Sequence, residues 1–235
     1  DMKNGGQGAP LAPFFHFACA LWAGIKEPVA FLNLGGLANV TLVDPNKVSP
    51  EIDGALLAFD TGPANAPLND LMKTRMNQFY DRNGALAAKG TANEFILKRI
   101  VQHPFFSQKP PKSLDRHDFH YALDLVKKLN DEDAASTLTA LPAACVAASQ
   151  CHLPIQPRNW VVSGGGAQNP TLMNELKKRL SGRVAPVESI GLASDMIEAQ
   201  AFAFLAVRTL RGLPLSAPST TGIAVPTKGG QIAIP

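Results

Sequence analysis

Apolar runs predict three β-strands in the first third of the chain. The stretch 29–43 contains two β-prone runs around a Gly-Gly pair, which predicts a strand, a tight turn and a returning strand. A third apolar run, 56–59, leads into Asp60 and a Gly-Pro turn. A strand that ends in an acid beside a glycine turn can hold a carboxylate at the rim of a sheet, where ligands bind. Asp60 is therefore a candidate functional residue; the alternative is an acid that only caps the next turn or helix.

Helical spacing of apolar positions predicts the helices that follow. The segments with a helical pattern are 14–23, 65–79, 84–89, 92–102, 119–129, 134–150, 170–180 and 194–210. Pro142 predicts a kink or a break in the segment 134–150. In the last segment Ser194 is the expected cap. From Met196 to Val207 that segment is apolar all round apart from Glu198 and Gln200, which predicts a buried helix.

A second glycine-rich feature lies late in the chain. A short apolar strand near 159–163 runs into Gly164, Gly165 and Gly166, and a helix begins near Pro170. This order brings backbone and a helix N-terminus against a nucleotide. The spacing matches neither a Walker loop nor GxGxxG, so it does not name the ligand, and a tight strand-to-helix crossover is the alternative.

The order of the elements favours an α/β domain over a helical bundle or a β-sandwich. The segment 184–187 is expected to be an edge strand. Arg116, after a Pro-rich loop, is either a partner for a carboxylate or an anion, or a solvated arginine.

Composition narrows the class of protein. The 235 residues are 46% hydrophobic and 17% charged, enough for one large or two small domains with a full core. The net charge is +3 and the basic residues are scattered, which argues against a nucleic-acid partner. Three cysteines without CxxC spacing favour a reducing, cytoplasmic compartment over a disulfide or zinc framework. No apolar run reaches the length of a membrane span.

Short sequence motifs lie at 5–11 together with His16, and at 33–41, 59–63, 80–84, 110–113, 163–170 and 195–199. In their sequence and order they resemble the motifs of the anhydro-N-acetylmuramic acid kinase family, in the actin/hexokinase/Hsp70 superfamily. The resemblance implies a ribonuclease-H-like (actin-like ATPase) lobe, with a mixed sheet flanked by helices. It also implies that residues 1–235 are the C-terminal nucleotide-binding lobe of a two-lobe kinase, with an irregular tail at 213–235. Because the chain begins at Asp1 within a glycine-rich loop, we expect a piece of a longer protein whose N-terminal phosphate-loop lobe is absent.

The activity implied by the resemblance is ATP-dependent phosphorylation of 1,6-anhydro-N-acetylmuramic acid. The anhydro ring opens in the same reaction, giving N-acetylmuramic acid 6-phosphate in peptidoglycan recycling. The implied cofactors are ATP and Mg²⁺, with no metal ligand assigned in this chain. A homodimer is also expected, as is common in the family.

The resemblance assigns roles to individual residues. Asp60 would be the general base that activates the attacking water. Nucleotide contacts are implied at Asn33, Gly35, Gly36, Thr61, Gly62, Gly164, Gly165 and Gly166. Of these, the residues between 33 and 36 would meet the β- and γ-phosphates and the late glycines the adenosine. Glu198 and Gln7 would face the sugar.

The motif after Asp60 departs from the family pattern at Ala64, where the family usually has glycine. A methyl group there could disturb a glycine conformation or a close approach. Two alternatives therefore stay open: another sugar kinase of the superfamily, or a non-catalytic nucleotide-binding module that lacks the first lobe. We expect the 235 residues alone to bind nucleotide weakly and not to turn over substrate.

Overall fold

The structure is a computed structural model that describes residues 1–115 and 117–233. Arg116, considered above as an anion partner, lies outside the described residues. The described residues form one five-stranded sheet in the order β3-β2-β1-β4-β5. Its strands are β1 (Val29–Leu34), β2 (Leu37–Val43), β3 (Leu56–Pro63), β4 (Asn159–Ser163) and β5 (Arg183–Pro186).

Strand directions confirm the mixed sheet. The first three strands form an antiparallel meander, whereas β4 pairs parallel with β1 and β5 pairs parallel with β4. β5 lies at the edge, as predicted. This order and these directions are those of a ribonuclease-H-like lobe. The carboxyl ends of the parallel strands β1 and β4 meet at one rim, where both glycine-rich turns begin.

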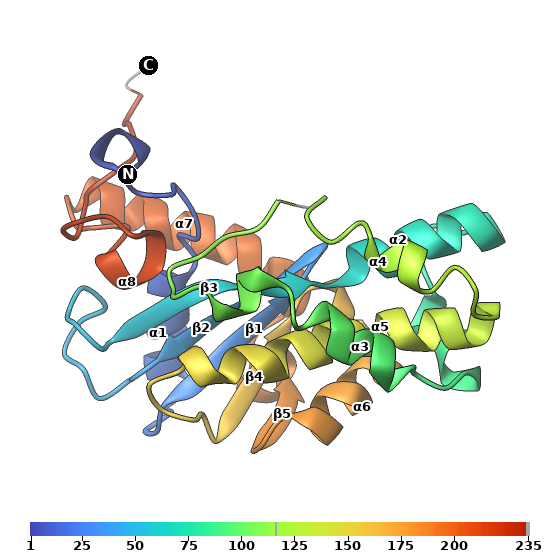
Figure 1. Cartoon of the computed structure of the whole chain (residues 1–235). Coiled ribbons are helices and arrows are strands. Elements are labelled where there is room, and N and C mark those ends of the chain that lie inside the picture. Colours follow the sequence, from blue (N-terminus) through green and yellow to red (C-terminus); the bar gives the residue numbers. More distant parts are fainter. Residues whose placement is uncertain (116, 234–235) are drawn as a thin grey trace.

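Helices cover both faces of the sheet (Figure 1). On one face, α5 (Asp131–Ser149) and α6 (Pro170–Arg179) pack over alternate strand residues such as Leu32 and Val162. On the other face, α1 (Pro13–Trp22) packs over residues of opposite parity such as Phe31 and Val161. Outside α1 lies α7 (Ile197–Leu210), and α8 (Pro218–Thr221) contacts β3. This period-2 alternation is what a sheet buried on both faces requires.

A second apolar cluster lies beyond the rim of the sheet. It joins the start of α5 to three short helices. These are α2 (Asn65–Leu71), α3 (Glu94–Ile100) and α4 (Ala122–Leu125). Between them the chain runs through single 3₁₀ turns, such as Arg82–Gly84 and Ala87–Lys89 where a helix over 84–89 was expected.

Three helix predictions were wrong in detail. The α-helix that begins at Asn65 ends at Leu71 and continues only as a π-helical turn, Met72–Met76, before Asn77 adopts φ 53°. The segment 119–129 contains only the single turn α4, flanked by other turns. Of the kink or break predicted at Pro142, the break does not occur: α5 is continuous, and the neighbouring side chains Leu138 and Leu141 are fully buried. Packing on these side chains holds the helix where one backbone hydrogen bond is missing.

The prediction that the last helix is buried was also wrong. Only Ala201, Leu205 and Arg208 of α7 are buried, whereas Phe202 is 63% exposed and Leu210 66% exposed. The helix forms the outermost layer and contacts α1 with one face only. Ser194 does not cap it: that residue begins a separate 3₁₀ turn, and the N-cap position is Met196, without a side-chain bond.

The two ends of the chain pack against each other (Figure 1). The Thr221 hydroxyl donates to the Asp1 carboxylate at 2.7 Å, and the Gln7 N–H donates to the Thr221 carbonyl at 2.8 Å. The segment after residue 212 is mostly irregular apart from α8 and one isolated bridge, Ser216 to Thr227.

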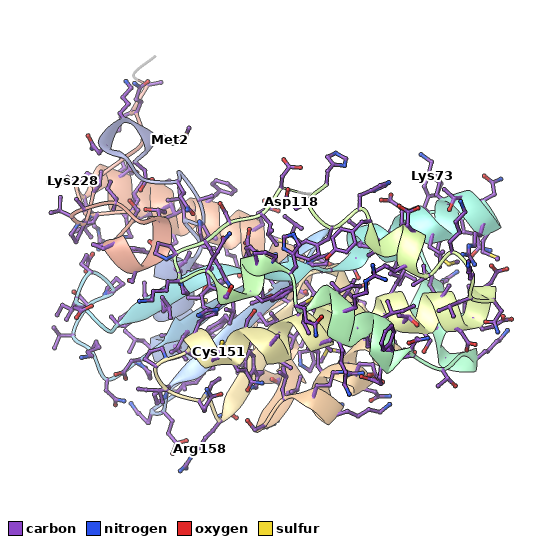
Figure 2. The ribbon with its side chains drawn as sticks, viewed as in Figure 1. Met2, Lys73, Asp118, Cys151, Arg158 and Lys228 are labelled. Carbon is purple, nitrogen blue, oxygen red and sulfur yellow. The ribbon has the colours of Figure 1, made fainter. Side chains whose placement is uncertain are left out.

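The molecular surface carries scattered charge. Lys73, Arg158 and Lys228 extend from three separate parts of the molecule (Figure 2). In the described part of the chain, no helix combines the length and the apolar character needed to cross a bilayer.

Candidate active site

Four polar side chains form a row across four adjacent strands. Asp60 on β3 is paired in register with Asn39 on β2, Asn39 with Asn33 on β1, and Asn33 with Ser163 on β4. Residues paired in register lie on the same face of a sheet. The row lies on the α1 face, one pleat beyond the buried pair of Phe31 and Val161. Asn39 and Asp60 continue the regular register of β2 and β3; beyond them the register shifts, so that Ala38 lies opposite Gly62. Polar groups from four strands thus reach the rim together.

Asp60 is held by a segment from elsewhere in the chain. Its N–H donates to the Lys112 carbonyl at 3.0 Å, and its Oδ2 accepts from the Leu114 N–H at 2.9 Å. Burial raises the pKa of the Asp60 carboxyl, and the Leu114 N–H partly opposes this by stabilising the carboxylate. Among the described residues, Oδ1 has no hydrogen-bond partner. The geometry therefore leaves one carboxylate oxygen free to accept a proton.

Lys112 anchors the segment that holds Asp60. Its side chain is buried, and Nζ donates to the Phe105 carbonyl at 2.9 Å while lying 4.3 Å from the centroid of the Phe105 ring. Burial lowers the pKa of Lys112 to about 8. Sequence reasoning assigned no role to Lys112 or Leu114, although the motif at 110–113 was a signal that this loop matters.

The turn between β1 and β2 contains the first glycine pair. The Gly35 N–H donates to the Leu37 carbonyl at 3.1 Å, whereas the N–H of the exposed Gly36 has no partner among the described residues. The Gly36 N–H is thus available to an anion, as expected for a phosphate-binding turn.

The three late glycines differ in what they do. Gly164 has φ +80°, and a Cβ there would lie 2.6 Å from Asn33 Oδ1, so the turn approaches β1 closely. Gly166 packs against Leu34 and Leu172, where a Cβ would lie 2.6 Å from the Leu34 Cβ. Gly165 alone faces open space. Two of these glycines therefore allow close packing at the rim, and the third is free to meet a ligand.

Thr61 and Gly62, which follow Asp60 on β3, are both buried. The Thr61 side chain is fully buried, and its hydroxyl donates to the Ala38 carbonyl at 3.2 Å. At Gly62 a Cβ would lie 2.7 Å from the Cys145 Cβ of α5. Their nucleotide contacts stay predictions.

The Ala64 side chain is buried in the sheet core. The backbone of Ala64 also donates to the Gly36 carbonyl at 3.0 Å. The methyl group therefore packs in the core and leaves the neighbouring turn in place.

Two cavities flank the rim. One of about 440 Å³ is lined by three members of the polar row (Asn33, Asn39 and Ser163) and by Gly164, His16 and Glu198. The other, of about 490 Å³, is lined by Asn65, Asn69, Tyr80 and Gly165 among others. Gln7 is exposed next to Gly8, which lines the first cavity. The glycines that follow β4 thus border both cavities.

His16 is a buried, neutral member of the first cavity wall. Its Nδ1 lies 3.0 Å from Thr41 Oγ1, and its ring stacks on Phe31 with the centroids 4.8 Å apart. Burial lowers the pKa of His16 to about 4.

We expect His16 to make stability depend on pH. Because the pKa is about 4 when folded and 6.5 as a reference for the unfolded chain, the unfolded state binds the proton first as pH falls. The free energy of unfolding should therefore drop by about 2 kcal/mol between pH 6.5 and pH 5 through this group. Urea unfolding of wild type and His16→Gln across that range measures the drop. The free energy of unfolding should fall less steeply with falling pH in the variant than in wild type. His117→Gln, at an exposed position, should keep the wild-type slope. Equal slopes for wild type and His16→Gln would contradict the expectation.

The fold and the site define a class of protein, the ribonuclease-H-like lobes, with an acid on β3 and glycine turns after β1 and β4. The sequence profile of anhydro-N-acetylmuramic acid kinases matches residues 1–234, and the chain belongs to that family.

Named relatives agree with this assignment. The anhydro-N-acetylmuramic acid kinase of Roseobacter denitrificans is 55% identical over 235 residues, covering 100% of this chain and 62% of the relative. That of Cereibacter sphaeroides is 56% identical, covering 100% of this chain and 63% of the relative. The chain thus spans less than two thirds of the length of these relatives. Among solved structures, xylulose kinase from Lactobacillus acidophilus matches with a TM-score of 0.47 at 12% identity, over 80% of this chain and 41% of that one. That likeness is too loose to add to the assignment.

Proposed function

We propose that this chain supplies the general base and the nucleotide site of an ATP-dependent kinase that acts on 1,6-anhydro-N-acetylmuramic acid. In this proposal residues 1–235 are the C-terminal lobe, and an N-terminal phosphate-loop lobe completes the enzyme. The observation that carries it is the polar row: Asp60 stands at one end, and the other three members line a cavity. Membership of the kinase family supports the choice of substrate.

The sugar is proposed to bind in the 440 Å³ cavity. Amide and hydroxyl side chains from Asn39 and Ser163 can both donate to and accept from the hydroxyl groups of a sugar. Asn33, proposed to contact the phosphates, lines the same cavity. Glu198 adds an acceptor, and Phe202 and Leu205 add apolar surface on the wall opposite. Gln7 lies at the edge of the same cavity in this proposal.

The adenosine is proposed to bind in the 490 Å³ cavity, against Gly165. The phosphates would then extend along the rim to the Gly35-Gly36 turn, with the Gly36 N–H as a donor. We propose that Mg²⁺ is held mainly by the phosphates and water, as is common for this ion. Among the described residues, no group of three or more His, Cys, Asp or Glu side chains could hold a metal ion.

Asp60 is proposed to remove a proton from a water molecule that attacks the anomeric carbon of the sugar. The bond from that carbon to O6 breaks as the carbon–water bond forms. The freed O6 then attacks the γ-phosphorus, the bond to the β-phosphate oxygen breaks, and ADP leaves. The Leu114 N–H fixes one Asp60 oxygen, and the free oxygen accepts the proton.

An isotope experiment on the full-length protein tests this function. With ATP, Mg²⁺ and the anhydro sugar in ¹⁸O-water, the product should carry one ¹⁸O at the anomeric hydroxyl and a phosphate on O6. Phosphorylation of another sugar without ¹⁸O uptake would favour a different sugar kinase. Nucleotide binding without any transfer would favour the non-catalytic module. The 235-residue chain alone should give no product.

We also propose a homodimer and a cytoplasmic location for the full-length protein. The exposed Val207 and Leu210 of α7 support burial of this helix in an assembly. Sedimentation of the full-length protein at micromolar concentration tests the dimer, and a monomer would refute it.

A further inference from the structure

We propose that Asn65 is a positioning residue that fixes the orientation of the Gly35–Gly36 peptide, so that the Gly36 N–H is directed outward to receive a phosphate oxygen. This inference rests on the nucleotide site proposed above. It concerns a residue to which neither the sequence motifs nor the family resemblance assigned a role.

The carbonyl groups of the turn all face the start of α2. The Asn65 side-chain amide donates to the Leu34 carbonyl at 3.0 Å and to the Gly35 carbonyl at 2.8 Å. Because both partners are acceptors, the amide nitrogen must face them. The Asn65 backbone N–H also donates to the Gly35 carbonyl, at 3.0 Å. The Gly36 carbonyl accepts from the N–H groups of Ala64 and Ala66 at 3.0 and 3.2 Å.

This arrangement determines where the Gly36 N–H points. The C=O and N–H of a trans peptide point in opposite directions, and the bond between Gly35 and Gly36 is not among the cis bonds of the described chain. With the Gly35 carbonyl turned to Asn65, the Gly36 N–H must point away from α2. It has no partner among the described residues, whereas the Gly35 N–H is already bonded within the turn.

A glycine pair needs such a restraint. Without side chains, both residues can adopt several backbone conformations, and the peptide between them can flip. A flip would present the Gly35 carbonyl, an acceptor, to a phosphate. Asn65 opposes it with one side-chain and one backbone hydrogen bond to the Gly35 carbonyl, and its side-chain bond to the Leu34 carbonyl restrains the preceding peptide. The side chain lies partly buried in the lining of the 490 Å³ cavity.

The test compares two ligands on the full-length protein. Asn65→Leu keeps the approximate size of the side chain and removes both donors without adding charge. We expect its ADP affinity to fall about five- to tenfold, the range of one or two hydrogen bonds. Adenosine affinity should fall clearly less than ADP affinity, because adenosine has no phosphate to accept from the Gly36 N–H, although Asn65 also lines the cavity proposed for adenosine. Asn174→Leu, at an exposed position on α6, is the matched control and should bind both ligands as wild type does.

A second readout follows the turn itself. In ¹⁵N-labelled wild type the Gly36 amide resonance should shift on titration with ADP and not with adenosine, and in Asn65→Leu this shift should be lost. Asn65→Ser is a second variant in case the leucine variant does not fold, because serine suits a helix start and is too short to reach both carbonyls. Unchanged ADP affinity, or equal weakening of ADP and adenosine, would overturn the positioning role. If wild type bound neither ligand, the nucleotide site itself would be refuted.

Discussion

Replacing Asp60 with asparagine in the full-length protein is expected to lower kcat by about 10²- to 10⁴-fold, the usual contribution of a general base. Asparagine keeps the shape and can still accept from the Leu114 N–H, but it cannot take a proton from water. Nucleotide affinity should stay close to wild type, because Gly165 and Gly36, the contacts proposed for the adenosine and the phosphates, lie on other turns. Steady-state kinetics with the anhydro sugar, together with ADP titration, separates the two effects.

The pH dependence of the rate identifies the group. A base works only when deprotonated, and burial raises the pKa of Asp60, so activity should be lost as pH falls through a value above the ordinary range for aspartate. The residual activity of Asp60→Asn should lack that acid limb. Asp53→Asn, at an exposed position before β3, serves as the control and should keep both the rate and the limb. A full rate in Asp60→Asn would show that another group is the base.

Replacing Gly62 with alanine is expected to destabilise the chain by about 3–5 kcal/mol, the sum of backbone strain and overpacking. Gly62 has φ +147°, which alanine rarely adopts, and the new Cβ would lie 2.7 Å from the Cys145 Cβ. Urea unfolding of the 235-residue chain measures the change in free energy.

Gly24→Ala provides the comparison, because an alanine there would have a strained backbone but no steric overlap of its Cβ. Gly24 has φ +67° and no atom within 4 Å of an added Cβ, so Gly24→Ala should cost only the strain, about 1 kcal/mol. If Gly62→Ala were equally mild, contact with α5 would not be what requires glycine here, and the predicted role of Gly62 in nucleotide binding would gain weight. A large loss of stability instead assigns this glycine to packing between β3 and α5.

Elements with strong local patterns were predictable. The strands around Gly35-Gly36 and the strand before Gly164 occur where the sequence placed them. The strand expected to end at Asp60 starts as predicted but continues to Pro63, so the Gly-Pro pair predicted as a turn lies within β3. The segment 119–129 was less predictable, because the aromatic and apolar residues there pack as separate turns in the cluster around α5. For α7, hydrophobicity predicted burial, but the described chain supplies a packing partner for only one of its faces.

By itself the sequence determined the α/β class and the glycine turns, because strand alternation and turn chemistry are properties of neighbouring residues. The role of Asp60 as a base was implied by the family resemblance. Only the tertiary structure decided which groups meet. Strand register places Asp60, Asn39, Asn33 and Ser163 in one row, and the bonds from Leu114 to Asp60 and from Asn65 to Leu34 join residues 54 and 31 positions apart. Contacts over such separations depend on how the sheet and helices pack, and no local pattern encodes them.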